Sequence, residues 1–218
     1  MSINEELLRK IANSGKDSLT KIRPDWDEYF MILARIAATR STCLSRPTGA
    51  VIVKDKQVLS TGYNGSMPGV THCSDEGKCF RRRMGAADAG KYDNCRSIHS
   101  EANAIAQAAK RGVEIEGSSV YVTLYPCYVC TKLMASAGIK KIYYEYEYKT
   151  SIKGYAERDR LWHEATKKAG IEIQKVDISE PALAKTLTYL LMGTSWRREL
   201  SEDGKPSGKI DHLDVIIK

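Results

Sequence analysis

The sequence predicts an α/β protein in which a β-sheet is layered with helices. Short β-branched runs alternate with amphipathic or alanine-rich segments over residues 49–175, and this alternation favours a layered α/β sheet. With 218 residues, the chain is long enough for one such domain with a full core and short for two. We expect the main domain at 25–178, after a variable lead-in (1–24) and before a C-terminal helix and polar tail (179–218).

The first half of the chain predicts one helix and a pair of strands. The helix covers 25–38, with Asp25 as its N-cap. Apolar residues at helical spacing indicate its core-facing stripe: Tyr29, Phe30, Leu33, Ile36 and Ala37. Gly49–Lys54 is typical of a buried strand, and Val58–Tyr63 should return antiparallel to it. The loop 62–69 is rich in glycine, so its backbone either approaches a ligand closely or lies plainly on the surface.

The second half predicts further helices alternating with strands. Pro126 suits the first turn of its helix, where its missing N–H costs nothing, and Gly138 ends that helix. The sequence predicts helices at 100–110, from Pro126 to Gly138, at 155–169 and at 181–192, with strands at 119–123, 141–146 and 171–175.

Residues 71–98 form a cysteine-rich insert without clear periodicity. An irregular stretch of this length inside a compact domain is unusual unless it is functional or cross-linked. Four thiolates would close a structural zinc site, with His72 as a possible substitute ligand; the thiols concerned are Cys43, Cys73, Cys79 and Cys95. Buried free cysteines are the alternative. The triplet Arg81–Arg83 is either a solvated face or a contact for a phosphate or a subunit.

Two short motifs carry the chemistry: His99-Ser100-Glu101, and Pro126-Cys127 with Cys130 three residues on. One imidazole and two thiolates give zinc three protein ligands and leave the fourth position for water, as in catalytic sites. Glu101 is not needed as a ligand and is therefore free to move protons. The joint pattern matches the signature of zinc nucleobase deaminases. The alternative is a structural zinc knuckle that lacks a fourth ligand.

Composition and charge set the broad class. Hydrophobic residues make up 42% of the chain and charged residues 28%, as in ordinary globular proteins. No apolar run approaches the roughly 20 residues that span a bilayer, and the N-terminus lacks a signal pattern. We expect a cytoplasmic location, in the host if the chain is viral. The formal charge of +7 suits an anionic substrate or a nucleic acid without choosing between them.

Beyond the zinc motif, the sequence resembles the deoxycytidylate (dCMP) deaminases over roughly residues 26–174. The resemblance is strongest to the zinc-rich phage and bacterial type that includes the competence-operon deaminase. The matching segments are Trp26–Met31, Arg40–Cys43 with Arg46, Gly49–Val53, Ser60–Ser66 with Pro68 and Gly69, His72–Cys73, Ile98–Ile105, Val122–Thr123 and Pro126–Cys130.

The resemblance implies a three-layer cytidine deaminase-like fold, with a five-stranded mixed sheet and helices on both faces. It implies zinc-dependent hydrolysis of dCMP to dUMP with release of ammonia, which supplies dUMP for dTMP synthesis. It further implies a homohexamer that dCTP activates and dTTP inhibits, with Mg²⁺ accompanying the triphosphate. We expect no nucleic acid as substrate and no membrane partner.

The resemblance also implies residue roles. The catalytic zinc ligands would be His99, Cys127 and Cys130, with Glu101 as the proton shuttle. Substrate contacts would come from Asn64, which holds the sugar hydroxyl, and from Ala50 and Tyr148. The effector site would include Gly62, Tyr63, Asn64 and Gly65. Relatives from phages hold a second zinc through cysteines that match Cys43 and Cys73.

This chain departs from the family pattern at two places. Ser100 stands where the family often has alanine, and Lys149-Thr150 follow Tyr148 where an acidic residue is usual. Two other functions remain as alternatives. One is tRNA adenosine deamination, which would use the positive charge for phosphate contacts. The other is a non-catalytic zinc protein in DNA uptake or regulation.

Overall fold

The computed structural model describes residues 22–84, 95–147 and 155–192. Contacts divide the chain into a unit spanning Tyr29–Asp177 and a second unit formed by the chain on either side of it. The domain limits at residues 25 and 178 stay predictions. The expected substrate contact Tyr148 and the polar tail lie outside the described residues. Among the described helices, none has the length and hydropathy needed to cross a bilayer.

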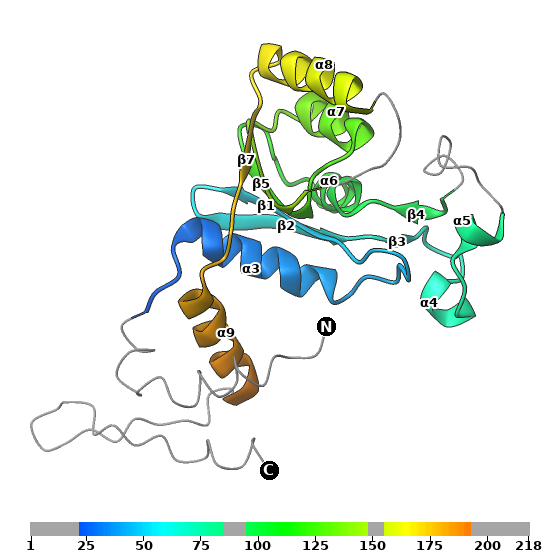
Figure 1. The fold of residues 1–218 in the computed structure, drawn as a ribbon, viewed down its shortest axis with the longest axis horizontal. Helices are drawn as coiled ribbons and strands as arrows, with labels where there is room; N and C mark the ends of the chain where they lie inside the picture. Colours follow the sequence, from blue (N-terminus) through cyan, green and yellow to red (C-terminus); the bar gives the residue numbers. More distant parts are fainter. Residues whose placement is uncertain (1–21, 85–94, 148–154, 193–218) are drawn as a thin grey trace, which may run out of the picture. The chain divides into compact units, whose positions relative to one another are not determined.

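A five-stranded mixed sheet forms the centre of the larger unit, in the order β2-β1-β5-β6-β7. β1 runs antiparallel to both β2 and β5, whereas β5, β6 and β7 are parallel to one another (Figure 1). The bounds are Gly49–Lys54 (β1), Gln57–Tyr63 (β2), Ser119–Leu124 (β5), Lys141–Tyr146 (β6) and Glu172–Lys175 (β7). The predicted five-stranded mixed sheet is therefore confirmed.

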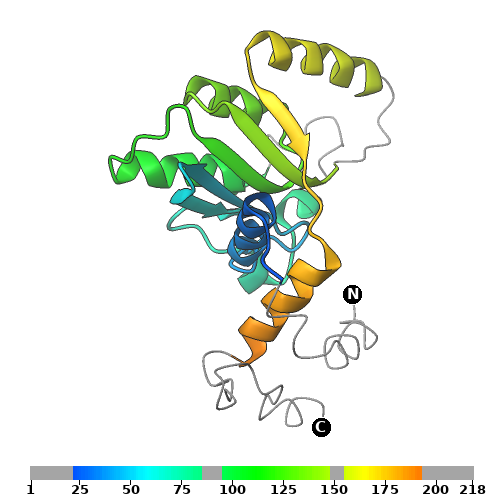
Figure 2. The same ribbon diagram turned by 90° about the vertical axis from the view of Figure 1, so that its left-hand side faces the viewer.

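Helices cover both faces of this sheet (Figures 1 and 2). The alternation of side chains along β5 shows how: Val120 and Val122 join the core beneath α6 and α7, whereas the Tyr121 ring faces Phe30 of α3 at 5.2 Å. The longer helices are α3 (Trp26–Ala38), α6 (Ser100–Lys110), α7 (Tyr128–Ser136), α8 (Tyr155–Lys168) and α9 (Glu180–Met192), the last in the second unit. The three-layer prediction is confirmed.

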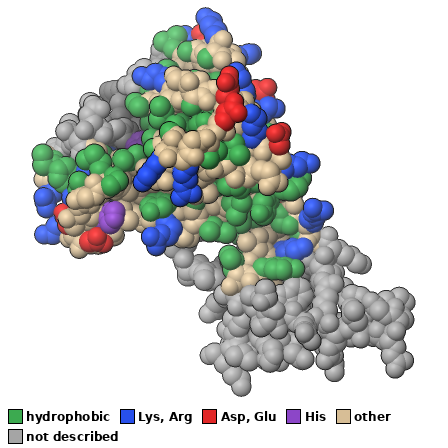
Figure 3. Space-filling model, turned by 180° about the vertical axis from the view of Figure 1, so that it is seen from behind, with side chains coloured by type: hydrophobic (Ala, Val, Ile, Leu, Met, Phe, Trp, Pro, Cys, Tyr) green, Lys and Arg blue, Asp and Glu red, His purple; other side chains and the backbone are tan. Residues whose placement is uncertain are grey.

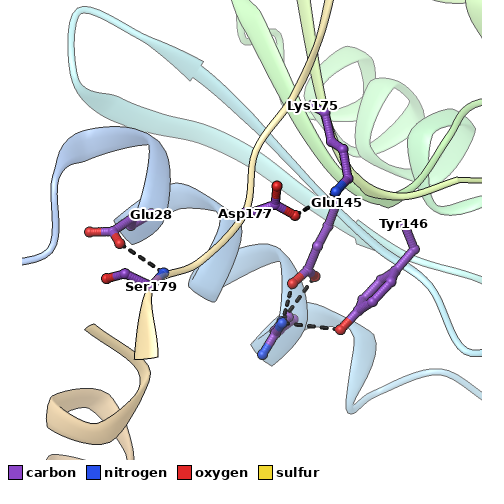
Figure 4. A network of polar contacts seen from close by, with 7 residues as sticks. Glu28, Glu145, Tyr146, Lys175, Asp177 and Ser179 are labelled. Carbon is purple, nitrogen blue, oxygen red and sulfur yellow. Dashed lines mark hydrogen bonds and ion pairs between the residues drawn. The ribbon is translucent and has the colours of Figure 1, made fainter. Parts of the chain in front are cut away.

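The start of α3 follows its sequence signals, but its buried face does not. Asp25 Oδ1 accepts from Glu28 N at 2.8 Å and Glu28 Oε2 accepts from Asp25 N at 2.9 Å, a reciprocal capping box. Glu28 Oε1 also accepts from Ser179 N at 3.0 Å (Figure 4). The predicted apolar stripe is partly wrong, because Tyr29 and Ile36 are exposed while Met31 and Ala34 are buried.

Small residues explain why the buried face of α3 is displaced. A Cβ on Gly49 would clash with the Ala34 carbonyl and lie 2.5 Å from Ala38 N, so β1 and α3 approach backbone to backbone. The helix therefore turns Phe30, Ala34 and Ala38, four residues apart, toward the sheet. The predicted stripe was built from large apolar residues, whereas the small Ala34 and Ala38 lie against Gly49, which explains the error.

The cysteine-rich insert contains regular structure that its sequence does not predict. Two short helices form, α4 (Cys73–Glu76) and α5 (Phe80–Arg83). Each helix has only four residues, about one turn, so an apolar repeat at helical spacing cannot appear in the sequence. A second, two-stranded sheet pairs β3 (Gly65–Ser66) with β4 (Ser97–Ile98), and Gly65 lies opposite Ile98. The insert is thus anchored on the strand that leads directly into His99.

Another close approach fixes α6 against β2. A Cβ on Gly62 would clash with the Ser100 carbonyl and lie 2.5 Å from Ala104 N. We expect Gly62→Ala to lower the free energy of unfolding by about 1–3 kcal/mol, because rigid backbone must move to admit the methyl group. Urea denaturation monitored by circular dichroism measures this change.

Gly65→Ala is the matched control for that substitution. Its Cβ would come too close to one atom, the Thr42 hydroxyl oxygen at 2.7 Å, and that side chain can rotate away. We expect a smaller loss of stability. A Gly62→Ala protein as stable as Gly65→Ala would contradict the close-packing account.

Candidate active site

The starts of α6 and α7 bring the sequence motifs together. His99 is the N-cap of α6 and Cys127 is the N-cap of α7, both with extended backbone. The prediction that Pro126 opens α7 is wrong, since the helix begins at Tyr128. The reason is that the Cys127 sulfur accepts from Cys130 N at 3.5 Å, so Cys127 itself provides the cap and Pro126 precedes it.

His99, Cys127 and Cys130 form a compact set of ligand atoms. His99 Nδ1 lies 3.5 Å from each of the two sulfurs, and all three atoms lie within 4.8 Å of one another. Over the part of the chain that the structure describes, this is the only such group of three or more His, Cys, Asp or Glu residues. One nitrogen and two sulfurs suit a tetrahedral zinc and leave one position open.

The two thiols shift each other's pKa in opposite directions. The hydrogen bond from the Cys130 thiol, together with that to His99, lowers the pKa of Cys127 to about 4. The same bond raises the pKa of Cys130, and the bond with Cys127 raises the pKa of His99. The lowered pKa favours the thiolate form of Cys127, the form that binds metals.

Glu101 lies in the first turn of α6 and is only 6% exposed. Its Oε2 accepts a hydrogen bond from Ser100 Oγ at 3.0 Å. Burial raises the pKa of its carboxyl group, opposed by the nearby His99. A carboxyl group enclosed in this way is suited to both accepting and donating a proton.

Asn64, the predicted sugar contact, organises the loop before β1. Its Oδ1 accepts from Ser41 Oγ at 2.6 Å and from Thr48 N at 2.9 Å, and its Nδ2 donates to the Arg46 carbonyl at 2.9 Å. Backbone bonds join Asn64 to Thr48 and to Thr42 as well. Since both lone pairs of Oδ1 are used, the carboxamide has one N–H left to donate to a ligand.

The other predicted contact residues lie in different settings. Ala50 is fully buried in the core cluster, whereas Tyr63 is partly exposed, with the Arg40 guanidinium 6.0 Å from its ring. Gly62 packs on α6 and Gly65 on Thr42. These glycines therefore serve close packing, and their roles toward an effector stay predictions.

The four remaining cysteines lie around the insert without forming a comparably tight group. Burial raises the pKa of the Cys95 thiol, and the nearby thiols of Cys43 and Cys79 raise it further. Cys73 is buried, and its sulfur accepts from Arg96 Nη2 at 3.6 Å. Arg96 also donates to Glu76 at 3.0 Å and lies 5.0 Å from the Phe80 ring. No sequence pattern pointed to Arg96, which ties α4 and α5 to β4.

A cavity of about 550 Å³ opens at the ends of β5 and β6. It is lined by Arg35, Ala38, Arg46, Pro47, Thr48, Thr123, Leu124, Glu145, Tyr146 and Glu147. Glu145 is 4% exposed and accepts from Arg35 Nε at 2.9 Å, with a second contact to the same guanidinium (Figure 4). Arg35 also donates to the Tyr146 hydroxyl at 3.2 Å. The lining residue Thr48 has its hydroxyl 3.2 Å from Ser100 Oγ, next to Glu101 in the chain.

Residues 24–146 match the cytidine and deoxycytidylate deaminase zinc-binding region. The chain belongs to this family. It is 42% identical to ComE operon protein 2 of Bacillus subtilis (strain 168), over 72% of this chain and 75% of that protein. It is also 42% identical to the deoxycytidylate deaminase of Mycobacterium phage D29, over 57% of this chain and 98% of that enzyme.

A solved structure of a dCMP deaminase shares the fold. The enzyme from the cyanophage S-TIM5, in complex with dCMP and dUMP, superposes with a TM-score of 0.53. It is 28% identical, and the match covers 71% of this chain and 99% of that one. The predicted cytidine deaminase-like fold and family are confirmed.

Zinc content tests the metal site directly. We expect Cys127→Ala to lose about one zinc ion per chain, because a two-ligand site holds zinc poorly. Inductively coupled plasma mass spectrometry on purified protein measures the loss. The exposed Lys132→Ala on the same helix is the control and should keep the wild-type content. Full zinc retention in Cys127→Ala would rule out this cysteine as a ligand.

Proposed function

We propose that the protein is a zinc-dependent dCMP deaminase, which hydrolyses dCMP to dUMP and ammonia and so supplies dUMP for dTMP synthesis. The observation that carries this proposal is the His99–Cys127–Cys130 group with the buried Glu101 beside it. Relatives that are named deoxycytidylate deaminases support the choice of substrate. A cytoplasmic location belongs to the same proposal.

The residues of the site divide the reaction between them. A zinc ion held by His99, Cys127 and Cys130 would lower the pKa of water so that hydroxide is available at neutral pH. Glu101 accepts the proton released from water and delivers it to the ring nitrogen next to the attacked carbon. Hydroxide adds to that carbon, and Glu101 then takes the proton of the added hydroxyl group and passes it to the amino group. The C–N bond breaks as the new C–O bond becomes a carbonyl, and ammonia leaves. The net change is dCMP plus water to dUMP plus ammonia.

The substrate is placed by the loop before β1 and by the cavity beside it. The one free N–H of Asn64 donates to the oxygen of a sugar hydroxyl, so this residue acts as a donor and not as an acceptor. A volume of about 550 Å³ accommodates a mononucleotide. Arg35 and Arg46 bring positive charge to the cavity wall. The carboxylate of Glu145 neutralises the charge of Arg35.

The β3–β4 sheet supports the proposal of effector control. Gly65, in the expected effector loop, pairs with Ile98, and His99 follows directly. A nucleotide that shifts this loop therefore acts on the strand leading into the zinc site. On this basis we include activation by dCTP with Mg²⁺ and inhibition by dTTP in the proposal.

Exposed apolar side chains support assembly into a homohexamer. Val129 and Leu133 of α7 are 67% and 39% exposed, and Leu161 of α8 is also exposed. Hydrophobic side chains form broad groups on the face drawn in Figure 3, with Lys and Arg side chains beside them. Exposed apolar surface of this kind marks interaction sites.

Turnover of dCMP is the decisive experiment. We expect the purified zinc-loaded protein to release ammonia from dCMP and Glu101→Gln to lose nearly all activity, because an amide cannot carry the proton. Ammonia release and dUMP formation are followed together, with and without dCTP and dTTP. The exposed Lys132→Ala serves as the unaffected control.

The same assay separates the competing functions. A tRNA anticodon stem-loop is offered in parallel with dCMP. Deamination of the RNA alone would establish a tRNA deaminase and overturn the proposal. A protein without activity on either substrate, with zinc bound, would favour a non-catalytic zinc protein.

A second, structural zinc in the insert is part of the proposal. Its ligands would come from Cys43, Cys73, Cys79 and Cys95, with His72 as a substitute. Cys43 and Cys79 lie close enough to Cys95 to raise its pKa, which supports this. We expect about two zinc ions per wild-type chain and about one after Cys79→Ala with Cys95→Ala, since a closed site needs four ligands. Mass spectrometry of the native protein counts the ions. A single zinc in the wild type would remove the structural site.

A further inference from the structure

We propose that Ser100 and Thr48 are positioning residues for Glu101. The Ser100 hydroxyl orients the Glu101 carboxylate, and Thr48 orients the Ser100 hydroxyl. This inference rests on the proposed deaminase function, in which Glu101 moves the protons.

The contact between Ser100 and Glu101 is short and shielded from water. Ser100 Oγ lies 3.0 Å from Glu101 Oε2, and Ser100 and Glu101 are 1% and 6% exposed. Water therefore has little room to replace the hydroxyl. A buried carboxylate oxygen gains more from such a bond than an exposed one, because nothing else solvates it.

The neighbouring Thr48 gives this bond its direction. Ser100 Oγ also lies 3.2 Å from Thr48 Oγ1, yet a serine hydroxyl has only one hydrogen to donate. An ionised carboxylate only accepts hydrogen bonds. Ser100 therefore donates to Glu101 and accepts from Thr48. The three side chains form one directed chain that ends on Glu101 Oε2.

Asn64 holds the other end of this chain. Thr48 N donates to Asn64 Oδ1 at 2.9 Å, and Asn64 N donates to the Thr48 carbonyl at 3.2 Å. The backbone of Thr48 is thus fixed on both sides of its α-carbon. The residue expected to bind the sugar and the residue expected to move protons are therefore joined through two hydroxyl groups.

A hydroxyl that only fills space would affect stability, whereas one that orients Glu101 affects the chemical step. Ser100→Ala removes the hydroxyl and adds no volume. We expect its kcat for dCMP to fall about tenfold, the effect of roughly one hydrogen bond at the transition state. Its KM should change less than about twofold, because the Ser100 hydroxyl is not expected to contact the bound substrate. Zinc content and the calorimetric Kd for dUMP should stay at wild-type values.

Thr48 variants test the direction of the chain. Thr48→Val keeps the shape and loses the hydroxyl, so we expect kcat to fall, whereas Thr48→Ser should restore it. The double variant Ser100→Ala with Thr48→Val should fall no further than Ser100→Ala, because both changes break the same chain.

Ser60→Ala is the matched control, since Ser60 is a buried serine that donates to the Ala104 carbonyl of the same helix at 2.7 Å. It should lower the melting temperature and leave kcat unchanged.

The results separate this inference from the proposed function. An active wild type whose Ser100→Ala variant keeps full kcat, or changes only in KM, would overturn the inference alone. Equal losses of kcat in Ser60→Ala and Ser100→Ala would also overturn it, because the effect would then be structural. A wild type without dCMP turnover would overturn the proposed function and the inference with it.

Discussion

The close approach of β2 to α6 at Gly62 is the constraint on which the rest of the site depends. Backbone atoms of Ser100 and Ala104 occupy the space that any larger residue would need at this position. Because α6 is held at its first turn, its packing on the sheet orients His99, its N-cap, and Glu101, together with the β3–β4 pair that leads into His99.

Burial makes each polar group of the site depend on a specific partner. Glu101 takes a hydroxyl from Ser100, and the Cys127 thiolate takes bonds from Cys130 and His99. The buried Glu145 takes two donors from Arg35. A buried polar group without such a partner would destabilise the fold by about 1–3 kcal/mol if it is neutral. A buried charge without a partner would cost more. The chemistry of the site and the stability of the fold therefore share the same contacts.

The sequence predicted those elements of the fold and site that depend on residues close together in the chain. The Asp25 cap, the strand at Gly49–Lys54 and the ligand set of His99 with the two cysteines follow from residue types at short spacing. Contacts between distant residues carried no such signal. Arg35 and Glu145 are 110 positions apart, and the residues around each of them contain no pattern that predicts the contact between the two. The β3–β4 pair is likewise too short for an alternation to be visible.

Asn64 shows why a residue role is harder to predict than a fold. A family resemblance assigns it to the sugar, but its side chain already binds Ser41, Thr48 and the Arg46 carbonyl. Replacing Asn64 would therefore release the loop before β1 and the hydroxyl chain to Glu101 at once, as well as any sugar contact. Loss of activity in such a variant would not isolate the sugar contact. The hydroxyls of Thr48 and Ser100 can be removed singly with less disturbance of the loop, so they report on the coupling between substrate binding and proton transfer more directly than Asn64 does.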